Sequence, residues 1–289
     1  MLEMCVFNVG LGQCIFLRPA ENNGEYSTLI DCGSSPGFSP ADFIKQFLPR
    51  NEWGQPNLKS LVLTNYDEDH FSGVVDLKNK VKIETISFAK NLSSDEIKNS
   101  KDIKTTALTE MLALKDGYTG AVSIWNPPYT KQSFSLNKNE IQETREDVLL
   151  NRWDTNNLSQ LVFIEYKGFV ICIPGDLEQK GWRNMLEKRP DVKPLLQRTR
   201  LLMASHHGRD NGYYPDIFNY CSPECVIISD EPLQYGTQDR MAAQYATHLR
   251  GNGILFEGTN RKVLTTRCDG HMLITIDDIG MATYKKLGI

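Results

Sequence analysis

Three short runs of side chains that can bind metal ions stand out in this sequence. They are Asn65-Tyr66-Asp67-Glu68-Asp69-His70, Gly175-Asp176 and His206-His207-Gly208. Each run follows directly on an apolar stretch that predicts a buried strand. Because strand ends along one edge of a sheet converge, the carboxylate, amide and imidazole groups of the three runs should surround one or two divalent ions.

The strands that must position these runs are short and apolar. We expect them over residues 58–64, 169–173 and 201–204. Alternate residues of an extended loop point the same way, so Asn65, Asp67 and Asp69 can share one face. His70 would turn in from the next backbone unit. The sequence therefore predicts one polar site at the edge of a sheet.

The remaining elements alternate between strands and helices. Further strands are expected over residues 4–17, with a break at Gly10-Leu11-Gly12, and over residues 27–30, 158–166 and 226–229. Helices are expected from Ser39-Pro40 through Leu48, around Trp182, Met185 and Leu186, and from a cap at Asp239 to Leu249. Lys167-Gly168 and Asp269-Gly270 are each expected to join two strands as a tight hairpin.

The length and composition predict one α/β domain over residues 1–289. With 289 residues, of which 40% are hydrophobic, the chain can bury one large core. Residues 91–157 are polar and interrupt the regular pattern. We expect this stretch to form an insertion or a lid.

The charge balance and the cysteines exclude several classes of protein. The 32 basic and 36 acidic residues give a net charge of −4, which excludes a uniformly basic nucleic-acid binder. No apolar run approaches the ~20 residues that cross a bilayer, and the first residues lack the pattern of a signal peptide. We therefore expect a soluble cytoplasmic protein with no membrane partner. The seven scattered cysteines predict reduced thiols, and Cys221 and Cys225 lack further zinc ligands nearby.

The order of the polar runs resembles the metallo-β-lactamase superfamily, whose hallmark is a His-x-His-x-Asp-His loop, then Gly-Asp, then a late histidine. More narrowly, the chain is similar to the ComEC-like branch, typified by the hydrolase domain of a competence protein. The matching segments are Asn8-Val9-Gly10-Leu11-Gly12-Gln13-Cys14-Ile15, Thr28-Leu29-Ile30-Asp31-Cys32-Gly33, residues 156–162, Ser205-His206-His207-Gly208 and residues 265–274. The resemblance covers almost the whole chain. It implies an αββα sandwich, a divalent-metal site at the sheet edges and hydrolysis of phosphodiester bonds in nucleic acid.

The chain departs from the family pattern on one side of the metal site. Asn65 and Asp67 stand where the family places its first two loop histidines, and Thr237 replaces the late histidine of the branch. Carboxylate and amide oxygens prefer harder ions than imidazole does. The departures therefore shift the expected cofactor from a zinc pair toward Mn²⁺ or Mg²⁺, or toward a single ion.

The resemblance and the residues together give a set of roles. The expected metal ligands are Asn65, Asp67, Asp69, His70, Asp176 and His206, and the expected catalytic residues are Asp69, Asp176 and His207. A metal-bound hydroxide, formed because zinc lowers the pKa of its water from ~15.7 toward ~7, would attack phosphorus. Asp176 would hold the metal or orient the hydroxide, and the histidine of the pair that is not a ligand would protonate the leaving group. The basic residues expected to track phosphates near the site are Lys180, Arg183, Lys188, Arg189, Lys193, Arg198 and Arg200.

Other interpretations of these residues stay open. The chain could be a non-catalytic member of the fold that binds a nucleotide, nucleic acid or partner protein, or it could hydrolyse a small ester, lactone or cyclic nucleotide. The basic stretch could be the solvated side of a helix. Asn8, Gln13 and Asp31 are expected only to stabilise the glycine turns. Because an intracellular nuclease needs control, we also expect a regulatory protein partner or a role in genome defence.

Overall fold

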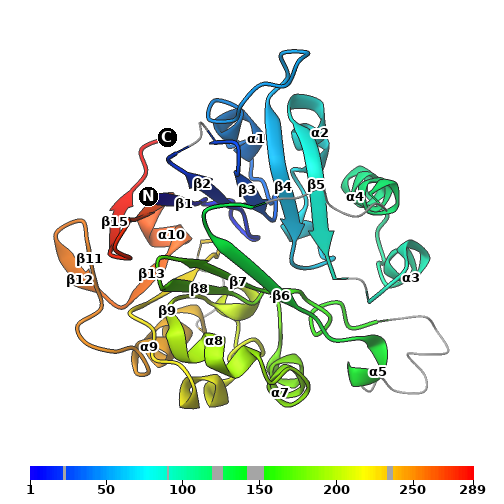
Figure 1. The fold of residues 1–289 in the computed structure, drawn as a ribbon. Coiled ribbons are helices and arrows are strands. Elements are labelled where there is room, and N and C mark those ends of the chain that lie inside the picture. Colours follow the sequence, from blue (N-terminus) through cyan, green and yellow to red (C-terminus); the bar gives the residue numbers. More distant parts are fainter. Residues whose placement is uncertain (22–23, 90, 119–125, 142–152, 233–236) are drawn as a thin grey trace.

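Two β-sheets packed face to face form the centre of the molecule, and helices cover their outer faces (Figure 1). The computed structural model describes residues 1–289 except 22–23, 90, 119–125, 142–152 and 233–236. In the described part of the chain, nine strands form one sheet and six form the other. This is the α/β sandwich that the sequence predicted.

The nine-stranded sheet contains the first strands of the chain and, from its C-terminal part, four more. Its order is β12-β11-β15-β14-β1-β2-β3-β4-β5. The bounds are β1 Leu2–Val6, β2 Ile15–Pro19, β3 Thr28–Ile30, β4 Asn57–Leu63, β5 Lys82–Phe88, β11 Ile254–Phe256, β12 Thr259–Arg261, β14 Met272–Ile276 and β15 Ala282–Lys286. Strands β3, β4 and β5 run parallel, so their C-terminal ends lie at the same edge.

The six-stranded sheet has the order β13-β10-β9-β8-β7-β6. Its strands are β6 Thr130–Phe134, β7 Leu161–Tyr166, β8 Phe169–Ile173, β9 Thr199–Met203, β10 Cys225–Ile228 and β13 Val263–Thr265. Strands β8, β9, β10 and β13 run parallel to one another, which again brings their C-terminal ends to one edge. β7 and β8 form the hairpin predicted at Lys167-Gly168.

Alternation along the strands explains why they are apolar on both faces. In β4, Val62 packs in the core between the two sheets, whereas Leu61 and Leu63 pack in the core beneath the helices. In β8, Ile171 likewise packs between the two sheets and Cys172 packs beneath the helices. A strand buried on both sides needs a continuous apolar run, which is why these strands could be predicted.

The helices form the outer layers. Their bounds are α1 Pro40–Ile44, α2 Val74–Lys80, α3 Ser94–Asn99, α4 Thr106–Gly117, α5 Lys138–Ile141, α7 Gln179–Lys188, α8 Val192–Arg198, α9 Thr237–Ala246 and α10 Thr266–Asp269, with 3-10 turns η2 Glu68–His70, η3 Ser205–Gly208 and η4 Pro215–Asn219. As predicted, Trp182, Met185 and Leu186 of α7 are buried. None of the helices in the described part of the chain combines the length and apolar character that a bilayer crossing requires. All seven cysteines are free thiols.

Three local predictions were wrong. Asp269-Gly270 does not join two strands of a hairpin, because α10 ends at Asp269 and β13 and β14 belong to different sheets. Asp239 lies in the first turn of α9, which begins at Thr237, so it is not the residue before the helix. The helix that Ser39 caps ends at Ile44, four residues earlier than expected.

Part of the polar stretch 91–157 belongs to the six-stranded sheet and to the hydrophobic core. Strand β6 pairs with β7 at the edge of the six-stranded sheet, and Leu108 and Met111 of α4 are buried in the common core. The residues between, 119–125 and 142–152, lie outside the described residues. A lid function for this stretch stays a prediction.

Candidate metal centre

Four of the predicted site residues meet at the edge where the strand ends converge. Asp69, His70, Asp176 and His207 each offer one ligand atom, and these four atoms lie within 4.8 Å of one another. Nε2 of His70 is 3.0 Å from Oδ1 of Asp176, and Nε2 of His207 is 3.1 Å from Oδ2 of Asp69 and 3.5 Å from the same Asp176 oxygen. Ligands at about 2.0–2.2 Å from one ion lie about 2.8–3.6 Å apart, so these spacings suit a divalent metal.

The strand ends are locked together by backbone contacts. Gly175, just after β8, has φ +59°, and a Cβ there would lie 3.0 Å from the side chain of Thr64 at the end of β4. The N–H of His206 donates to the carbonyl of Gly175 at 3.0 Å, which ties the histidine loop to the same point. His206 and His207 both have left-handed backbones, with φ of 49° and 55°. Such conformations cost non-glycine residues energy and are concentrated at functional sites.

Each imidazole is oriented by a partner on its far nitrogen. Nδ1 of His70 lies 2.9 Å from Oδ2 of Asp31, and Nδ1 of His207 lies 3.0 Å from the carbonyl of Ser229. These acceptors place the ring proton on Nδ1 and leave the lone pair on Nε2, as in metal sites with carboxylate or carbonyl partners.

The lone pairs that face one another need a cation between them. Nε2 of His70, Nε2 of His207 and Oδ1 of Asp176 are all buried and have no aligned hydrogen-bond partner. With both ring protons on Nδ1, three acceptors converge on one point, which is unfavourable unless a positive charge neutralises them. The two imidazoles and two carboxylates therefore fit a divalent ion.

Protons can take the place of the ion when it is absent. Burial lowers the pKa of His70, but the carboxylates of Asp176 and Asp31 outweigh that effect and raise the pKa well above its ordinary value. The pKa of His207 is also raised, since Asp176 and Asp69 overcome the effect of burial. Burial raises the pKa of Asp69 and Asp176, yet the facing imidazoles leave both carboxyl pKa values lowered. Metal and protons thus compete for this group.

Asp31 contacts a member of the candidate metal group, which the sequence analysis did not predict. It is fully buried, has φ of 56°, and accepts from the Thr64 N–H at 2.7 Å as well as from the side chains of Thr64 and Gln13 at 2.6 and 2.7 Å. We expected Asn8, Gln13 and Asp31 only to stabilise turns. Asn8 does so by accepting from the N–H of Gly10, but Asp31 holds His70. The available signal was an acidic residue directly after a buried strand.

Asn65 and Asp67 lie outside the four-residue group. Oδ1 of Asn65 accepts from the N–H of Asp67 at 2.9 Å, and its amide donates to Asn156 at 3.0 Å. Asp67 forms an ion pair with Lys101 and accepts from Thr155 at 2.8 Å. A lysine ammonium thus stands beside the carboxylate that was expected to bind a metal, and the structure does not bring either residue to the group.

The structure brings His207, and not His206, into the group that we expected His206 to join. His207 joins the group, whereas His206 points away, with Nδ1 3.4 Å from Oε1 of Glu178 and Nε2 3.3 Å from the guanidinium of Arg209. The consecutive left-handed residues turn the two rings in different directions, since the ring planes lie 65° apart. His206 is therefore not in the ligand group, and His207 is placed as a ligand.

A cavity of about 590 Å³ opens beside His207. Its wall consists of Leu11, Gln179, His207, Gly208, Arg209, Asp210, Asn211, Asp230, Glu231, Thr237 and Gln238. Thr237, which stands where the related branch has a histidine, lines this cavity. His207 thus belongs both to the candidate metal group and to the lining of the cavity.

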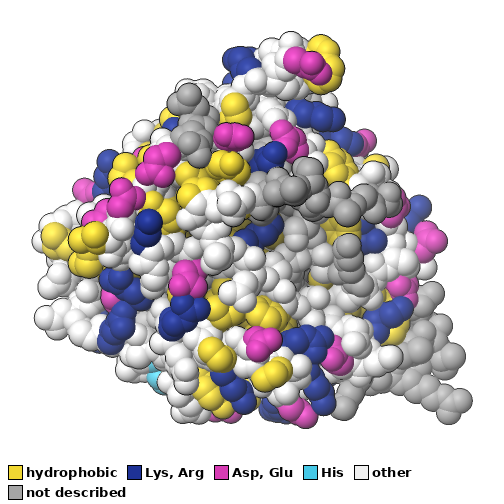
Figure 2. Space-filling view, in the orientation of Figure 1, with side chains coloured by type: hydrophobic (Ala, Val, Ile, Leu, Met, Phe, Trp, Pro, Cys, Tyr) yellow, Lys and Arg dark blue, Asp and Glu magenta, His cyan; other side chains and the backbone are white. Residues whose placement is uncertain are grey.

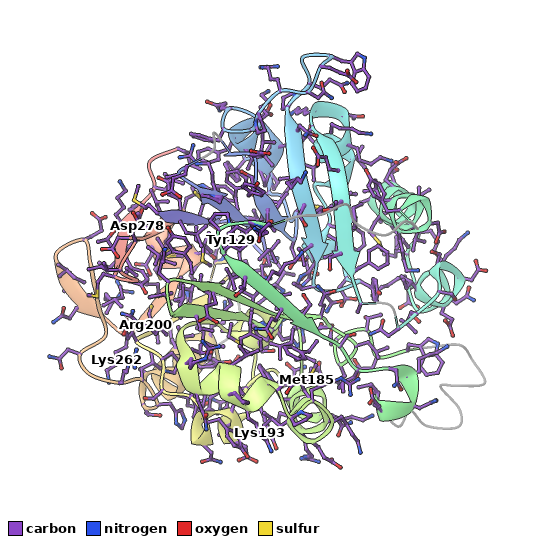
Figure 3. The ribbon with its side chains drawn as sticks, in the orientation of Figure 1. Tyr129, Met185, Lys193, Arg200, Lys262 and Asp278 are labelled. Carbon is purple, nitrogen blue, oxygen red and sulfur yellow. The ribbon has the colours of Figure 1, made fainter. Side chains whose placement is uncertain are left out.

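Several of the seven basic residues in the stretch 180–200 are paired with carboxylates. Arg189, Arg198 and Arg200 pair with Glu140, Glu165 and Glu224. Figure 3 shows Lys193 on α8 and Arg200 on β9, and Arg200 lies at the start of this strand, whereas the histidine pair follows its end. On the face seen in Figure 2, basic and acidic side chains are interspersed. The solvated interpretation of this stretch agrees with these contacts.

Comparison with known proteins supports the family resemblance. The sequence model described as "Metallo-beta-lactamase superfamily" matches residues 8–95. The ComE operon protein 3 of Bacillus subtilis (strain 168) is 23% identical over 238 residues, which cover 78% of this chain. The chain spans only 28% of the length of that relative.

Two solved structures are similar to this chain. The CmlA beta-hydroxylase E377D mutant is similar with a TM-score of 0.50 and 11% identity, over 94% of this chain and 54% of that one. The metallo-beta-lactamase fold protein YhfI from Bacillus subtilis has a TM-score of 0.47 and 11% identity, over 98% and 100% of the two chains. Residues 8–95 therefore match the metallo-β-lactamase superfamily, and the two packed sheets agree with the sandwich that the resemblance implied.

Proposed function

We propose that this protein is a metal-dependent hydrolase that cleaves phosphodiester bonds in DNA or RNA. The observation that carries the proposal is the group of Asp69, His70, Asp176 and His207, whose buried lone pairs converge beside an open cavity. The nucleic-acid substrate rests on the resemblance to the ComEC-like branch.

The four residues would hold one divalent ion, and their supporting contacts fix them for that task. Bound there, the ion would polarise the phosphoryl group and lower the pKa of a water molecule. Asp31 and the carbonyl of Ser229 keep the two Nε2 atoms directed inward. With 21% of its side chain exposed, Asp69 is the most accessible of the four.

The donor set indicates which ion to test first. Two imidazoles and two carboxylates suit Zn²⁺ or Mn²⁺ better than Mg²⁺, which prefers oxygen ligands and retained water. The oxygen-rich half of the site that favoured Mg²⁺ is not part of the group, because Asp67 pairs with Lys101.

A second candidate function is a non-catalytic protein that uses the fold for binding. The ion pair between Asp67 and Lys101 favours it, since one half of the family's metal site is filled by internal contacts. The two candidates differ in whether the loaded protein turns over a substrate.

The test is hydrolysis of DNA and RNA, single- and double-stranded, by the full chain loaded with Mn²⁺ or Zn²⁺. Asp176→Asn should reduce cleavage by more than the roughly 100-fold that loss of an outer partner of a metal ligand costs. Asp76→Asn is the matched control, because Asp76 is a surface carboxylate paired with Lys80. If the loaded wild type cleaves nothing, or if Asp176→Asn cleaves equally well, the proposal is wrong.

A further inference from the structure

Arg209 is a cation on the cavity wall, and it forms no ion pair with a carboxylate in the part of the chain that the structure describes. It lines the same cavity as His207. The next residue in the chain, Asp210, pairs with Arg240 at 3.1 Å. Asp230, also on the wall, pairs with Arg267. Among the described residues, the side-chain contact to the Arg209 guanidinium comes from Nε2 of His206, at 3.3 Å. Glu231 also lines the cavity but forms no ion pair with Arg209, so the guanidinium of Arg209 remains available to a ligand there.

The backbone that carries Arg209 is held firmly. The N–H of Arg209 donates to the carbonyl of His206 at 2.9 Å, and its carbonyl accepts from Gly212 at 3.0 Å. A Cβ at Gly212 would lie 2.5 Å from the carbonyl oxygen of Ser205, so the loop closes tightly on itself. The left-handed residues His206 and His207 set the turn before it. Arg209 therefore projects from a fixed loop one turn beyond a metal ligand.

His206 and Glu178 orient the guanidinium. Oε1 of Glu178 lies 3.4 Å from Nδ1 of His206 and is itself held by the amide of Asn211 at 2.6 Å. Nε2 of His206, on the side of the ring away from this carboxylate, faces the guanidinium of Arg209 at 3.3 Å. Only one edge of the guanidinium is used in this way, which leaves the other donors for a ligand.

We propose that Arg209 recognises the anionic phosphoryl group of the substrate, with His206 and Glu178 as positioning residues. The proposal rests on the proposed function and deepens it, because it assigns the residue that would bind the anionic phosphoryl group of the substrate. A guanidinium binds two oxygens of a phosphate through parallel donors, which a lysine ammonium cannot do. The positioning role also explains why His206, next to His207 in the chain, is directed away from the candidate metal group.

The test compares binding of inorganic phosphate and hydrolysis of bis(4-nitrophenyl) phosphate by the metal-loaded full chain. Arg209→Gln should weaken phosphate binding by about tenfold or more and raise KM to a similar extent, with a smaller change in kcat. Arg209→Lys should recover only part of the affinity. His206→Asn, chosen because Asn tolerates the left-handed backbone, should raise KM by a few-fold and keep the metal. Arg50→Gln, an exposed arginine that bonds Gly54 of its own loop, is the control and should change neither quantity.

The outcomes separate this inference from the proposed function. If the wild type hydrolyses the diester while Arg209→Gln leaves KM and phosphate affinity unchanged, the inference is wrong and the function stands. If the wild type binds phosphate through Arg209 but hydrolyses nothing, the inference stands and the function is wrong. An equal loss of phosphate affinity in Arg50→Gln would also overturn the inference, because it would show a general effect of charge.

Discussion

Asp31→Asn is the substitution that tests most sharply how the metal group is held. The carboxylate accepts four hydrogen bonds, with Oδ1 serving the N–H of Thr64 and Oδ2 serving the hydroxyl of Thr64, the amide of Gln13 and Nδ1 of His70. The substitution preserves size, and Asn tolerates the φ of 56° at this position. Its effects therefore come from the lost charge and the lost acceptor.

The expected magnitudes follow from these contacts. An amide nitrogen cannot accept a hydrogen bond, so in either orientation at least one buried donor loses its partner, at a cost of about 1–3 kcal/mol in the metal-free protein. If the amide instead donates to Nδ1 of His70, the ring proton moves to Nε2 and opposes the metal. Loss of such an outer partner lowers metal affinity by about 10- to 100-fold, or about 1.4–2.8 kcal/mol.

Two measurements separate these effects. Competition with a chromophoric chelator gives the metal affinity, and chemical unfolding in EDTA gives the free energy of unfolding of the metal-free protein. Asp76→Asn should leave metal affinity unchanged and alter stability by no more than about 1 kcal/mol, as exposed ion pairs usually do. A folded Asp31→Asn protein with wild-type metal affinity would refute the role of Asp31.

The remaining predictions concern the number of ions, pH and stability. Titration with Mn²⁺ or Zn²⁺ should saturate at one ion per chain, because Lys101 pairs with Asp67, and a second tight site would contradict this. In EDTA, the raised pKa values of His70 and His207 mean that their ion pairs are complete below pH 6.5 and are lost as the pH rises through those values. Their contribution to the free energy of unfolding should therefore fall as the pH rises above 6.5, and this fall should be smaller in His207→Asn, which retains only His70. Metal at a hundredfold excess over its Kd should stabilise the protein by about 2.7 kcal/mol in thermal or chemical unfolding, and an unchanged midpoint would count against binding to the folded state.

Much of the fold and half of the site could be predicted because the evidence is local. The continuous apolar runs before Asp67, Asp176 and His206 identify strands buried on both faces, and polar residues directly after them mark the strand ends. The hairpin at Lys167-Gly168 follows the same local rule. The Asp269-Gly270 prediction failed because this dipeptide can also end a helix, where glycine accepts a positive φ.

The parts of the site that were missed depend on contacts distant in sequence. Lys101 reaches Asp67 across 34 positions, so the pattern around Asp67 could not reveal that its carboxylate is already paired. Asp31 meets His70 because β3 and β4 are parallel neighbours. The choice between His206 and His207 depends on two left-handed residues in succession, which the sequence does not specify.

Metal analysis of a matched pair of variants tests the central claim most directly. His206→Asn and His207→Asn change adjacent residues of the same type and similar burial, but only His207 belongs to the metal group. After loading and removal of free ions, we predict about one ion per chain in the wild type and in His206→Asn, and far less than one in His207→Asn. A wild type without metal, or loss of the ion in His206→Asn instead of His207→Asn, would contradict the account.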